Sequence, residues 1–468
     1  MARTAKKETA LTAEERLAQA LVPDAEQPYQ VPENWCWTRV GVLSSLHRGV
    51  SYKKDDAHSV KQENDCLVMR GGNIGEGYID IDADNVYVDL RLVSEDQLVK
   101  KNDVIIVAST GSTKVIGRAG ISLADYPDVA FGAFLMVVRP NKKAVPRYLD
   151  YYFQSDLYRN RIRDLASGVN INNIRADYIT ESPYPLPPLA EQQRIVDRIE
   201  SLFTKLDEAK EKAQAVVDGF EDRKAAILHK AFTGELTAGW RMEHKLSADT
   251  WRPCSLIDLC EKIFDGPFGS NLKTEDYVSA GIRVVRLENL KNQWFDDSKQ
   301  SYITEEKYAT ISGHTVYPSD LIMSTFIADE TKVCQMPQYI GFAVNKADCI
   351  GIRVKNTTST KFLLYYLSSR DVFNLLFEQL HGATRPRVNT KTIKAIPVQV
   401  PELDEQKEIV RILESILRSE EQAKETAEQV IDQIDAMKKA ILARAFRGEL
   451  GTNDPTDESA EELLKRVL

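Results

Sequence analysis

Two long stretches of the chain alternate apolar residues at spacings of four and three. In residues 191–232 these positions are Ile195, Ile199, Leu202, Leu206, Ala209, Ala213, Val216 and Phe220. In residues 405–446 they are Ile409, Leu413, Ile416, Ala423, Ala427, Val430, Ile434, Met437 and Ile441, with one polar interruption at Glu420. This spacing is the apolar seam of a coiled coil, so the pattern predicts two long helices.

Proline and glycine mark where these helices begin and end. Pro187-Pro188 and Pro401 stand just before the two stretches, and Gly234 and Gly448 stand just after them. Proline ends any helix that arrives from upstream, and glycine is the residue that most often follows a helix. Each helix is therefore predicted to span about 42 residues, or roughly 60 Å at 1.5 Å per residue.

The two helical stretches are copies of one another, displaced by 214 residues. An ungapped comparison of 191–236 with 405–450 gives 21 identities in 46 positions. Each apolar seam needs a partner, and the other copy supplies one within the same chain. Because the chain leaves one helix, forms a globular segment and returns, we expect an antiparallel pair. Homodimerisation through each seam separately is the alternative.

The globular segments, about 37–180 and 251–395, are predicted to be mixed α/β. Short β-branched runs such as 104–107 and 282–285 recur between Gly, Asn and Asp clusters. The 214-residue offset joins Trp37 to Trp251. It drifts to 216 where Val68-x-Arg70-x-x-Asn73 meets Val284-x-Arg286-x-x-Asn289. The two domains therefore share a framework, but their inner sequences have diverged, so we expect them to bind two different things.

Composition limits the class of protein. The chain has 468 residues and a net charge of −9, which argues against nucleic acid, but segments 37–180 and 251–394 are close to neutral. No apolar run approaches the roughly 20 residues that span a bilayer, and no secretory signal is evident, so we expect a cytoplasmic protein without membrane contact. The six cysteines show no metal spacing and are expected to be buried thiols.

The motifs of several enzyme classes are absent from the sequence. It holds no Gly-x-x-x-x-Gly-Lys-Ser/Thr, no Asn/Asp-Pro-Pro-Tyr/Phe and no His-Glu-x-x-His. The six histidines are scattered. We therefore predict a protein that is not an enzyme, with no metal and no cofactor of its own. A nuclease with an unrecognised site remains a third possibility.

Polar loops suited to DNA occur at matching places in the two globular segments. Bases are read by Arg, Lys, Asn, Gln, Ser and Thr, and phosphates are held by Lys, Arg, hydroxyls and backbone N–H groups. The loops are 47–54, 109–114 and 167–175 in the first domain, and 268–273, 324–325 and 381–389 in the second. The alternative is that these segments are only turns. The Arg-Pro-Arg of the last loop makes it the strongest candidate.

The predicted DNA contacts combine these loops with the Arg-x-x-Asn matches. In the first domain they are Arg48, Ser51, Tyr52, Lys53, Lys54, Arg70, Asn73, Ser109, Thr110, Ser112, Lys114, Asn170, Asn172, Asn173 and Arg175. In the second domain they are Ser270, Asn271, Lys273, Arg286, Asn289, Thr325, Lys332, Thr384, Arg385, Arg387 and Asn389.

The duplicated architecture resembles the specificity subunit of type I restriction–modification enzymes. The resemblance rests on the Pro-Leu-Pro-Pro-Leu-Ala-Glu-Gln-Gln start and the Ala-Phe-x-Gly-Glu-Leu ends of the helices, and it covers about 31–450. It implies a pseudo-twofold molecule with two target recognition domains separated by two antiparallel coiled-coil helices. Each domain would read one half of a split, asymmetric double-stranded DNA site, and the helices would set the gap.

The resemblance also implies partners and boundaries. The partners are two modification (methyltransferase) subunits, which carry S-adenosylmethionine and methylate adenine, and restriction subunits, which carry the ATP- and Mg-dependent motor and nuclease. The predicted parts are an N-terminal arm (1–30), target recognition domain 1 (31–185), spacer helix 1 (186–236), a linker (237–250), target recognition domain 2 (251–399), spacer helix 2 (400–450) and a C-terminal tail (451–468). The alternative function is a duplicated protein-binding adaptor whose coiled coil acts as a ruler.

Overall fold

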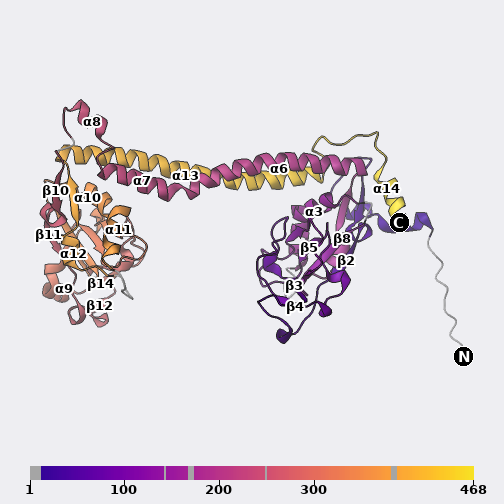
Figure 1. Ribbon diagram of the computed structural model, residues 1–468, viewed down its shortest axis with the longest axis horizontal. Helices are drawn as coiled ribbons and strands as arrows, with labels where there is room; N and C mark the ends of the chain where they lie inside the picture. The colour runs from indigo at the N-terminus through magenta and orange to yellow at the C-terminus, as the bar shows by residue number, and fades with distance from the viewer. Residues whose placement is uncertain (1–11, 142–143, 167–172, 248–249, 381–386) are drawn as a thin grey trace. The chain divides into compact units, whose positions relative to one another are not determined.

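The computed structural model describes residues 12–141, 144–166, 173–247, 250–380 and 387–468 (Figure 1). The chain divides into two compact units. Unit 1 comprises Met1–Lys212 with Val430–Leu468, and unit 2 comprises Ala213–Gln429. Both units are mixed α/β, as predicted. Each unit combines a globular domain with parts of both long helical segments; unit 2 is one continuous stretch of chain, whereas unit 1 is made of two.

Unit 1 contains nine strands in its described part. They are β1 (Cys36–Arg39), β2 (Ser44–Arg48), β3 (Asp65–Met69), β4 (Tyr87–Asp89), β5 (Val104–Val107), β6 (Ala119–Ile121), β7 (Val129–Phe131), β8 (Leu135–Pro140) and β9 (Pro183–Leu186). They form sheets in the orders β2-β8-β5-β6, β4-β3-β7 and β1-β9. The shorter helices are α1 (Ala13–Ala20), α2 (Val40–Leu43), α3 (Pro146–Gln154), α4 (Asp156–Ala166), α5 (Ala176–Thr180) and α14 (Ala460–Val467).

Unit 2 repeats this plan. Its strands are β10 (Arg252–Ser255), β11 (Cys260–Phe264), β12 (Tyr277–Val278), β13 (Ile282–Val285), β14 (Ser301–Ile303), β15 (Thr315–Val316), β16 (Leu321–Ser324), β17 (Val333–Gln335), β18 (Ala343–Asn345), β19 (Cys349–Val354) and β20 (Pro397–Val400). The orders β11-β19-β16-β17 and β10-β20 match those of unit 1, and β14-β13-β18 lies within a five-stranded sheet. The shorter helices are α8 (Ala238–Glu243), α9 (Glu305–Ile311), α10 (Thr360–Leu367), α11 (Arg370–Glu378) and α12 (Thr390–Lys394).

The first long helical stretch is two helices where the sequence predicts one. α6 (Leu189–Asp218) and α7 (Phe220–Phe232) are separated by Gly219, whereas α13 (Leu403–Ala445) runs without interruption. Glycine is among the weakest helix formers, and the second copy has glutamine at the matching position. At the break the Arg223 guanidinium donates to the Val216 carbonyl at 2.8 Å and pairs with Glu420 at 2.7 Å.

Ion pairs join the long helices within each unit. In unit 1, Asp207 of α6 pairs with Lys438 of α13, and Lys210 pairs with Asp435 at 2.7 Å. In unit 2, α7 contacts the earlier part of α13 through Arg223 and Glu420. The predicted intramolecular antiparallel pairing therefore holds within unit 1, where the residue numbers rise along one helix and fall along the other.

The predicted apolar seam is only partly a helix–helix interface. Its first residues lie in domain cores: Ile195 and Ile199 join the core of unit 1, and Ile409 and Leu413 join the core of unit 2. Further along, Ala209, Ala423 and Met437 are exposed, contrary to the prediction. The seam is buried most deeply at the places where a domain covers it.

Each domain core includes the end of the other helical segment. The core of unit 1 contains Leu442, Ala445 and Phe446 of the α13 end, and the Phe446 ring lies 5.2 Å from that of Tyr148. The core of unit 2 contains the α7 residues Leu228, Ala231 and Phe232. The repeated Ala-Phe-x-Gly-Glu-Leu motif thus serves the same packing role at both helix ends.

The repeated Glu-Gln at each helix start is explained by hydrogen bonds. Gln192 donates to the Pro187 carbonyl at 3.0 Å and accepts from the Val145 N–H at 3.3 Å. Gln406 donates to the Pro401 carbonyl at 2.8 Å and accepts from the Ser359 N–H at 2.8 Å. In both copies the glutamine fastens the start of the long helix to the segment that leads into α3 or α10.

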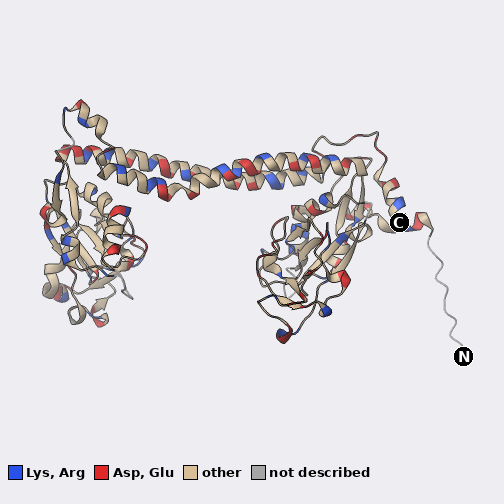
Figure 2. Ribbon diagram, viewed as in Figure 1, with Lys and Arg blue, Asp and Glu red and all other residues tan. Residues whose placement is uncertain are grey.

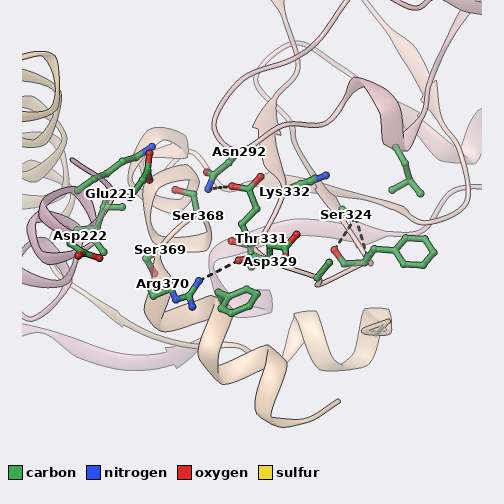
Figure 3. Close-up of a pocket in the computed structure, with 18 residues that line it drawn as sticks. Glu221, Asp222, Asn292, Ser324, Asp329, Thr331, Lys332, Ser368, Ser369 and Arg370 are labelled. Atoms are coloured by element: carbon green, nitrogen blue, oxygen red, sulfur yellow. Dashed lines mark hydrogen bonds between the residues drawn. The ribbon is translucent and has the colours of Figure 1, made fainter. Parts of the chain in front are cut away.

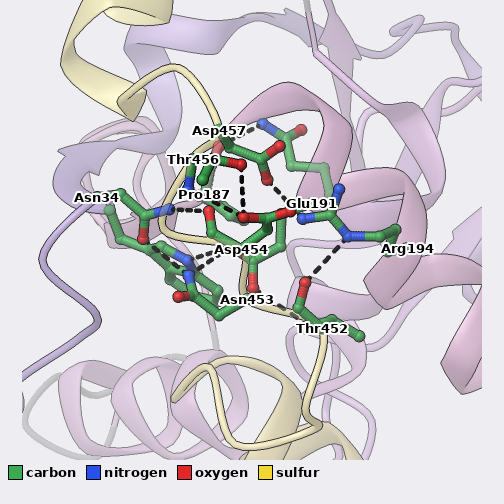
Figure 4. Close-up of polar contacts among 11 residues, drawn as sticks. Asn34, Pro187, Glu191, Arg194, Thr452, Asn453, Asp454, Thr456 and Asp457 are labelled. Carbon is green, nitrogen blue, oxygen red and sulfur yellow. Dashed lines mark hydrogen bonds and ion pairs between the residues drawn. The ribbon is translucent and has the colours of Figure 1, made fainter.

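The glutamates that precede these glutamines, Glu191 and Glu405, are buried. Glu191 binds the segment that follows α13, and Glu405 binds the segment that follows α7. Glu191 accepts from the Trp35 indole at 2.7 Å, from Asn453 at 2.9 Å and from Thr452 at 3.2 Å (Figure 4). Asp457 of the same tail pairs with Arg194. The C-terminal tail thereby closes over the start of α6.

Glu405 has a different environment in unit 2. It accepts from the Arg241 guanidinium at 2.6 Å and from the Thr237 hydroxyl at 2.7 Å, and both charged side chains are almost fully buried. The carboxylate at the start of α6 is thus satisfied by neutral donors, and its copy in α13 by an ion pair.

The buried ion pair gives a stability prediction. Arg241→Ala removes the only basic partner recorded for Glu405 in the described residues and leaves its carboxylate buried, a change that typically costs about 3–5 kcal/mol. Lys210→Ala breaks an ion pair whose side chains are 36% and 52% exposed, and such pairs contribute about 0–1 kcal/mol.

Urea unfolding of the full chain, followed by circular dichroism, measures both changes. The midpoint should fall clearly for Arg241→Ala and change little for Lys210→Ala. Equal small effects would show that Glu405 does not depend on Arg241.

Candidate nucleic-acid interface

In unit 1 the predicted polar loops meet around the turn between β7 and β8. The Val50 N–H donates to the Phe131 carbonyl at 2.8 Å. Gly49 lies so close to Gly132 that a Cβ atom would sit 2.1 Å from its carbonyl oxygen, so only glycine fits there. Loop 47–54 is therefore held against residues 132–134.

The turn between β7 and β8 also holds loop 109–114, and loop 173–175 is bonded to residues 108 and 109 at the start of that loop. The N–H groups of Ala108 and Ser109 donate to the Phe134 carbonyl at 2.9 and 3.0 Å. The Ile174 N–H donates to the Ala108 carbonyl at 2.8 Å, and Ser109 forms a β-bridge with Asn173. We call residues 47–54, 109–114, 132–134 and 173–175 the loop row of unit 1.

Unit 2 builds the same arrangement from different residues. A Cβ atom on Gly266 would meet the Lys346 carbonyl at 2.2 Å. The Thr325 N–H donates to the Asp348 carbonyl, and the Val388 N–H donates to the Thr325 carbonyl, each at 2.9 Å. Residues 265–273, 324–326, 346–348 and 387–389 form the loop row of unit 2. The backbone scaffold is thus repeated while the side chains it presents differ.

Most predicted contacts lie on these loop rows and are accessible. The exposed ones are Arg48, Ser51, Lys53, Lys54, Ser112, Lys114, Asn173, Arg175, Asn271, Lys273, Arg387 and Asn389. Tyr52, Ser109 and Thr110 are half-buried. Asn170, Asn172, Thr384 and Arg385 lie outside the described residues, as does the side chain of Ser270. Arg70, Asn73, Arg286 and Asn289 follow strands β3 and β13, outside the loop rows as defined.

Two of the predicted contacts have a structural role instead. Asn73 and Asn289 are buried. The Asn289 carbonyl oxygen accepts from the Arg286 N–H at 2.9 Å, and its amide donates to the carbonyls of Asp296 and Lys299 at 2.8 Å each. Asn73 accepts from the Arg70 N–H at 2.7 Å and donates to the Asp80 carbonyl at 2.9 Å. These amides hold a turn and do not face a ligand.

Three further predicted contacts are engaged within unit 2. Thr325 is buried, and its hydroxyl donates to Asp348 at 3.4 Å. The Asn389 side chain caps α12 by accepting from the Thr392 N–H at 2.9 Å. Arg387 pairs with Asp348 and lies over the Phe326 ring at 4.5 Å, while its side chain stays half exposed. Of these three, Arg387 is the side chain most available to a ligand.

Other predicted arginines also carry ion pairs. Arg70 pairs with Asp84, and Arg286 lies 3.4 Å from Glu288. Arg175 reaches Asp177 at 3.0 Å while its side chain remains 68% exposed. In each case the neighbouring carboxylate orients the arginine guanidinium in the absence of a ligand.

Lys332 lines a cleft of about 770 Å³ between α7 and the domain of unit 2 (Figure 3). Within it the Asn292 amide donates to Glu330 at 2.9 Å, and Arg370 donates to the Asp329 carbonyl at 3.3 Å. Unit 1 has a cleft of about 810 Å³ between its helices and its domain. The lining residues that match at the 214-residue offset are Glu221 and Asp435, Lys224 and Lys438, Ala225 and Lys439, Leu228 and Leu442, and Ser368 and Gln154. We call these two sites the helix–domain clefts.

The residues at the tips of the β7–β8 and β18–β19 turns are not among the contacts predicted from the sequence. Phe134 and Asp348 occupy the same place in their loop rows. The missed signal was the match of Gly132-Ala133-Phe134 with Lys346-Ala347-Asp348 at the 214-residue offset. Phe268 of unit 2, 57% exposed, is a second aromatic that the prediction omitted.

Charge does not separate the loop rows from the rest of the molecule. Lys and Arg lie among Asp and Glu along the long helices and over both domains (Figure 2). Among the described residues, no three His, Cys, Asp or Glu side chains form a group able to hold a metal ion, and no helix is long and apolar enough to cross a membrane. The six cysteines are free; Cys254 is partly exposed where burial was expected, and the other five are buried.

Comparison with known proteins identifies the family. Residues 32–217 and 248–431 match the type I restriction modification DNA specificity domain. The chain is 27% identical over 434 residues to the type I restriction enzyme StySPI specificity subunit of Salmonella potsdam, with 90% of each chain covered. It is 26% identical over 426 residues to the EcoKI specificity subunit of Escherichia coli K12, again with 90% of each covered.

Solved structures share the fold. A structure described as the basis of complex assembly and conformational transition of the type I R-M system has a TM-score of 0.67 at 18% identity, covering 90% of this chain and 100% of that chain. The HsdS subunit from Thermoanaerobacter tengcongensis has a TM-score of 0.56 at 19% identity, covering 91% and 100%.

The chain therefore belongs to the type I restriction modification DNA specificity family, and its role is DNA sequence recognition. The two family matches each take in one globular domain and the beginning of the helical stretch that follows it.

The buried asparagines give a test that separates structure from recognition. Asn289→Asp replaces the amide donor with an acceptor that faces the Asp296 and Lys299 carbonyls. Leaving buried groups unsatisfied costs about 1–3 kcal/mol, and more when a charge is involved. Asn271→Asp changes an exposed residue on the loop row and should leave the thermal unfolding temperature unchanged. A normal unfolding temperature for Asn289→Asp would contradict the structural role.

Proposed function

We propose that the chain directs a type I restriction–modification complex to a bipartite, asymmetric DNA site. Each loop row reads one half of the site. The two rows share the backbone hydrogen bonds that join the turn tip, at Phe134 or Asp348, to the second loop and the second loop region to the third, and they differ in the side chains they present, as expected of two readers of different sequences. This repeated scaffold with divergent side chains is the observation that carries the proposal.

The long helices act as the spacer between the two halves. In this proposal α6 and α7 pair with α13 as an antiparallel coiled coil, and the molecule has pseudo-twofold symmetry. The 21 identities among 46 aligned helical positions support it, because equal lengths let an antiparallel pair end flush. The domain boundaries predicted from the sequence remain part of the proposal.

The partners are two modification subunits and restriction subunits. The modification subunits bind S-adenosylmethionine and methylate adenine; the restriction subunits use ATP and Mg. The chain itself binds none of these cofactors and is not catalytic. The helix–domain clefts support the presence of two like partners, because the same helical positions line both. We propose that one modification subunit contacts each cleft.

Half-site separation can be tested with matched arginine variants. Arg175 and Arg387 lie on equivalent loops of the two units, and a base-reading arginine contributes about 1–3 kcal/mol of discrimination. Arg387→Ala should relax selectivity in one half-site only, and Arg175→Ala in the other only. Arg91, which is 89% exposed and lies outside the loop rows, provides the control.

The measurement is the affinity of the complex with modification subunits for duplexes altered in one half at a time, at fixed salt. Wild type and Arg91→Ala should discriminate equally in both halves. If one arginine variant relaxes both halves, the division of reading between the units is wrong. If wild type shows no sequence preference, the proposed function itself fails.

A further inference from the structure

Phe134 is a large apolar side chain displayed at the centre of the loop row of unit 1. It is 64% exposed. Loop 47–54 contacts one side of its turn through Gly132, and loop 109–114 is attached through the Phe134 carbonyl, while loop 173–175 is attached to the Ala108 carbonyl. The same loop row also presents accessible polar and basic residues, including Thr110, Asn173 and Arg175.

The backbone fixes the place of this phenylalanine. Two N–H groups, those of Ala108 and Ser109, converge on its carbonyl oxygen, and the Leu135 N–H closes the turn onto Gly132 at 2.8 Å. Phenylalanine has only two side-chain torsions, so little conformational entropy is lost when its ring contacts a ligand. The backbone therefore holds this phenylalanine at a defined position, and its ring has few conformations.

Unit 2 holds a different chemistry at the same position. The Asp348 carbonyl takes the place of the Phe134 carbonyl, and the Asp348 side chain pairs with Arg387. A carboxylate beside a guanidinium and an isolated aromatic ring have no recognition chemistry in common. The turn tip is therefore a position at which the two loop rows present different side-chain chemistry.

We propose that Phe134 is a specificity-determining residue that contacts the C5-methyl group of a thymine in the half-site read by unit 1. This inference rests on the proposed function. The thymine methyl is the apolar group that the major groove presents, and phenylalanine is among the side chains that contact it. An exposed ring gains from burying that methyl and gains nothing comparable from a cytosine edge.

Deoxyuridine tests the contact because it lacks only the methyl group. The complex with modification subunits is titrated against fluorescent duplexes of its recognised site, in which each thymine is replaced in turn by deoxyuridine. Burying one methyl corresponds to about a fourfold change in affinity. Wild type should lose about that factor at one position in one half-site. Phe134→Ala should bind the unmodified site about fourfold more weakly and be insensitive to deoxyuridine there.

Two further variants separate the contact from general effects. Phe134→Leu keeps an apolar side chain and should retain sensitivity to deoxyuridine. Leu123→Ala changes a residue of the same domain that is 70% exposed and lies beyond β6, near the opposite end of β5 from loop 109–114, and it should behave as wild type.

The outcomes distinguish this inference from the function on which it rests. If wild type is insensitive to every deoxyuridine, or if Phe134→Ala stays as sensitive as wild type, the thymine contact is wrong while sequence-specific binding stands. A recognised half-site without thymine on either strand overturns it equally. Absence of any sequence-specific binding by wild type would instead refute the proposed function.

Discussion

The structure depends on the contacts that the start of each long helical stretch makes with the segment beyond the end of the other stretch. Glu191 and Glu405 are buried carboxylates, and a buried carboxylate is tolerated only with hydrogen-bonding or charged partners. Those partners come from distant segments: Trp35, Thr452 and Asn453 for one, and Thr237 and Arg241 for the other. Each domain core therefore includes residues of both long helical stretches beside those of its own domain. In unit 1 the end of α13 and its tail come from a distant part of the sequence, whereas unit 2 is one continuous stretch.

This constraint explains why the helical segments have stayed alike while the loop rows have not. The repeated helical residues pack against each other and both domains, so a change at one of them disturbs several contacts at once. The loop rows are held by backbone hydrogen bonds, which do not depend on side-chain identity apart from close-approach positions such as Gly49 and Gly266. Side chains such as Phe134 and Asp348 can then be exchanged without disturbing the scaffold. A fold of this kind can change the sequence it reads and keep its partners.

The sequence predicted the helices, the duplication and the mixed α/β domains because those features leave local or directly comparable patterns. It could not show that Ile195 and Ile409 belong to domain cores, since the seam spacing is the same whether a helix or a domain covers it. The sequence could not show that Asn73 and Asn289 are buried in turns, because an asparagine suits a base edge and a tight turn equally well. Only the fold reveals that their amides are already engaged. Phe134 was missed because a phenylalanine beside a buried strand is expected to be core, and its exposure depends on the tip of the turn.

If the two loop rows read two separated halves of one DNA site, the methylated sites should carry both halves. A genome-wide map of methylated adenines, in cells with the gene and in cells from which it has been deleted, tests this most directly. The map should contain a motif that disappears on deletion and consists of two short defined stretches, different from one another, separated by a gap of fixed length and free sequence. A continuous motif, or a methylation pattern that the deletion leaves unchanged, would show that the two rows do not read separate halves.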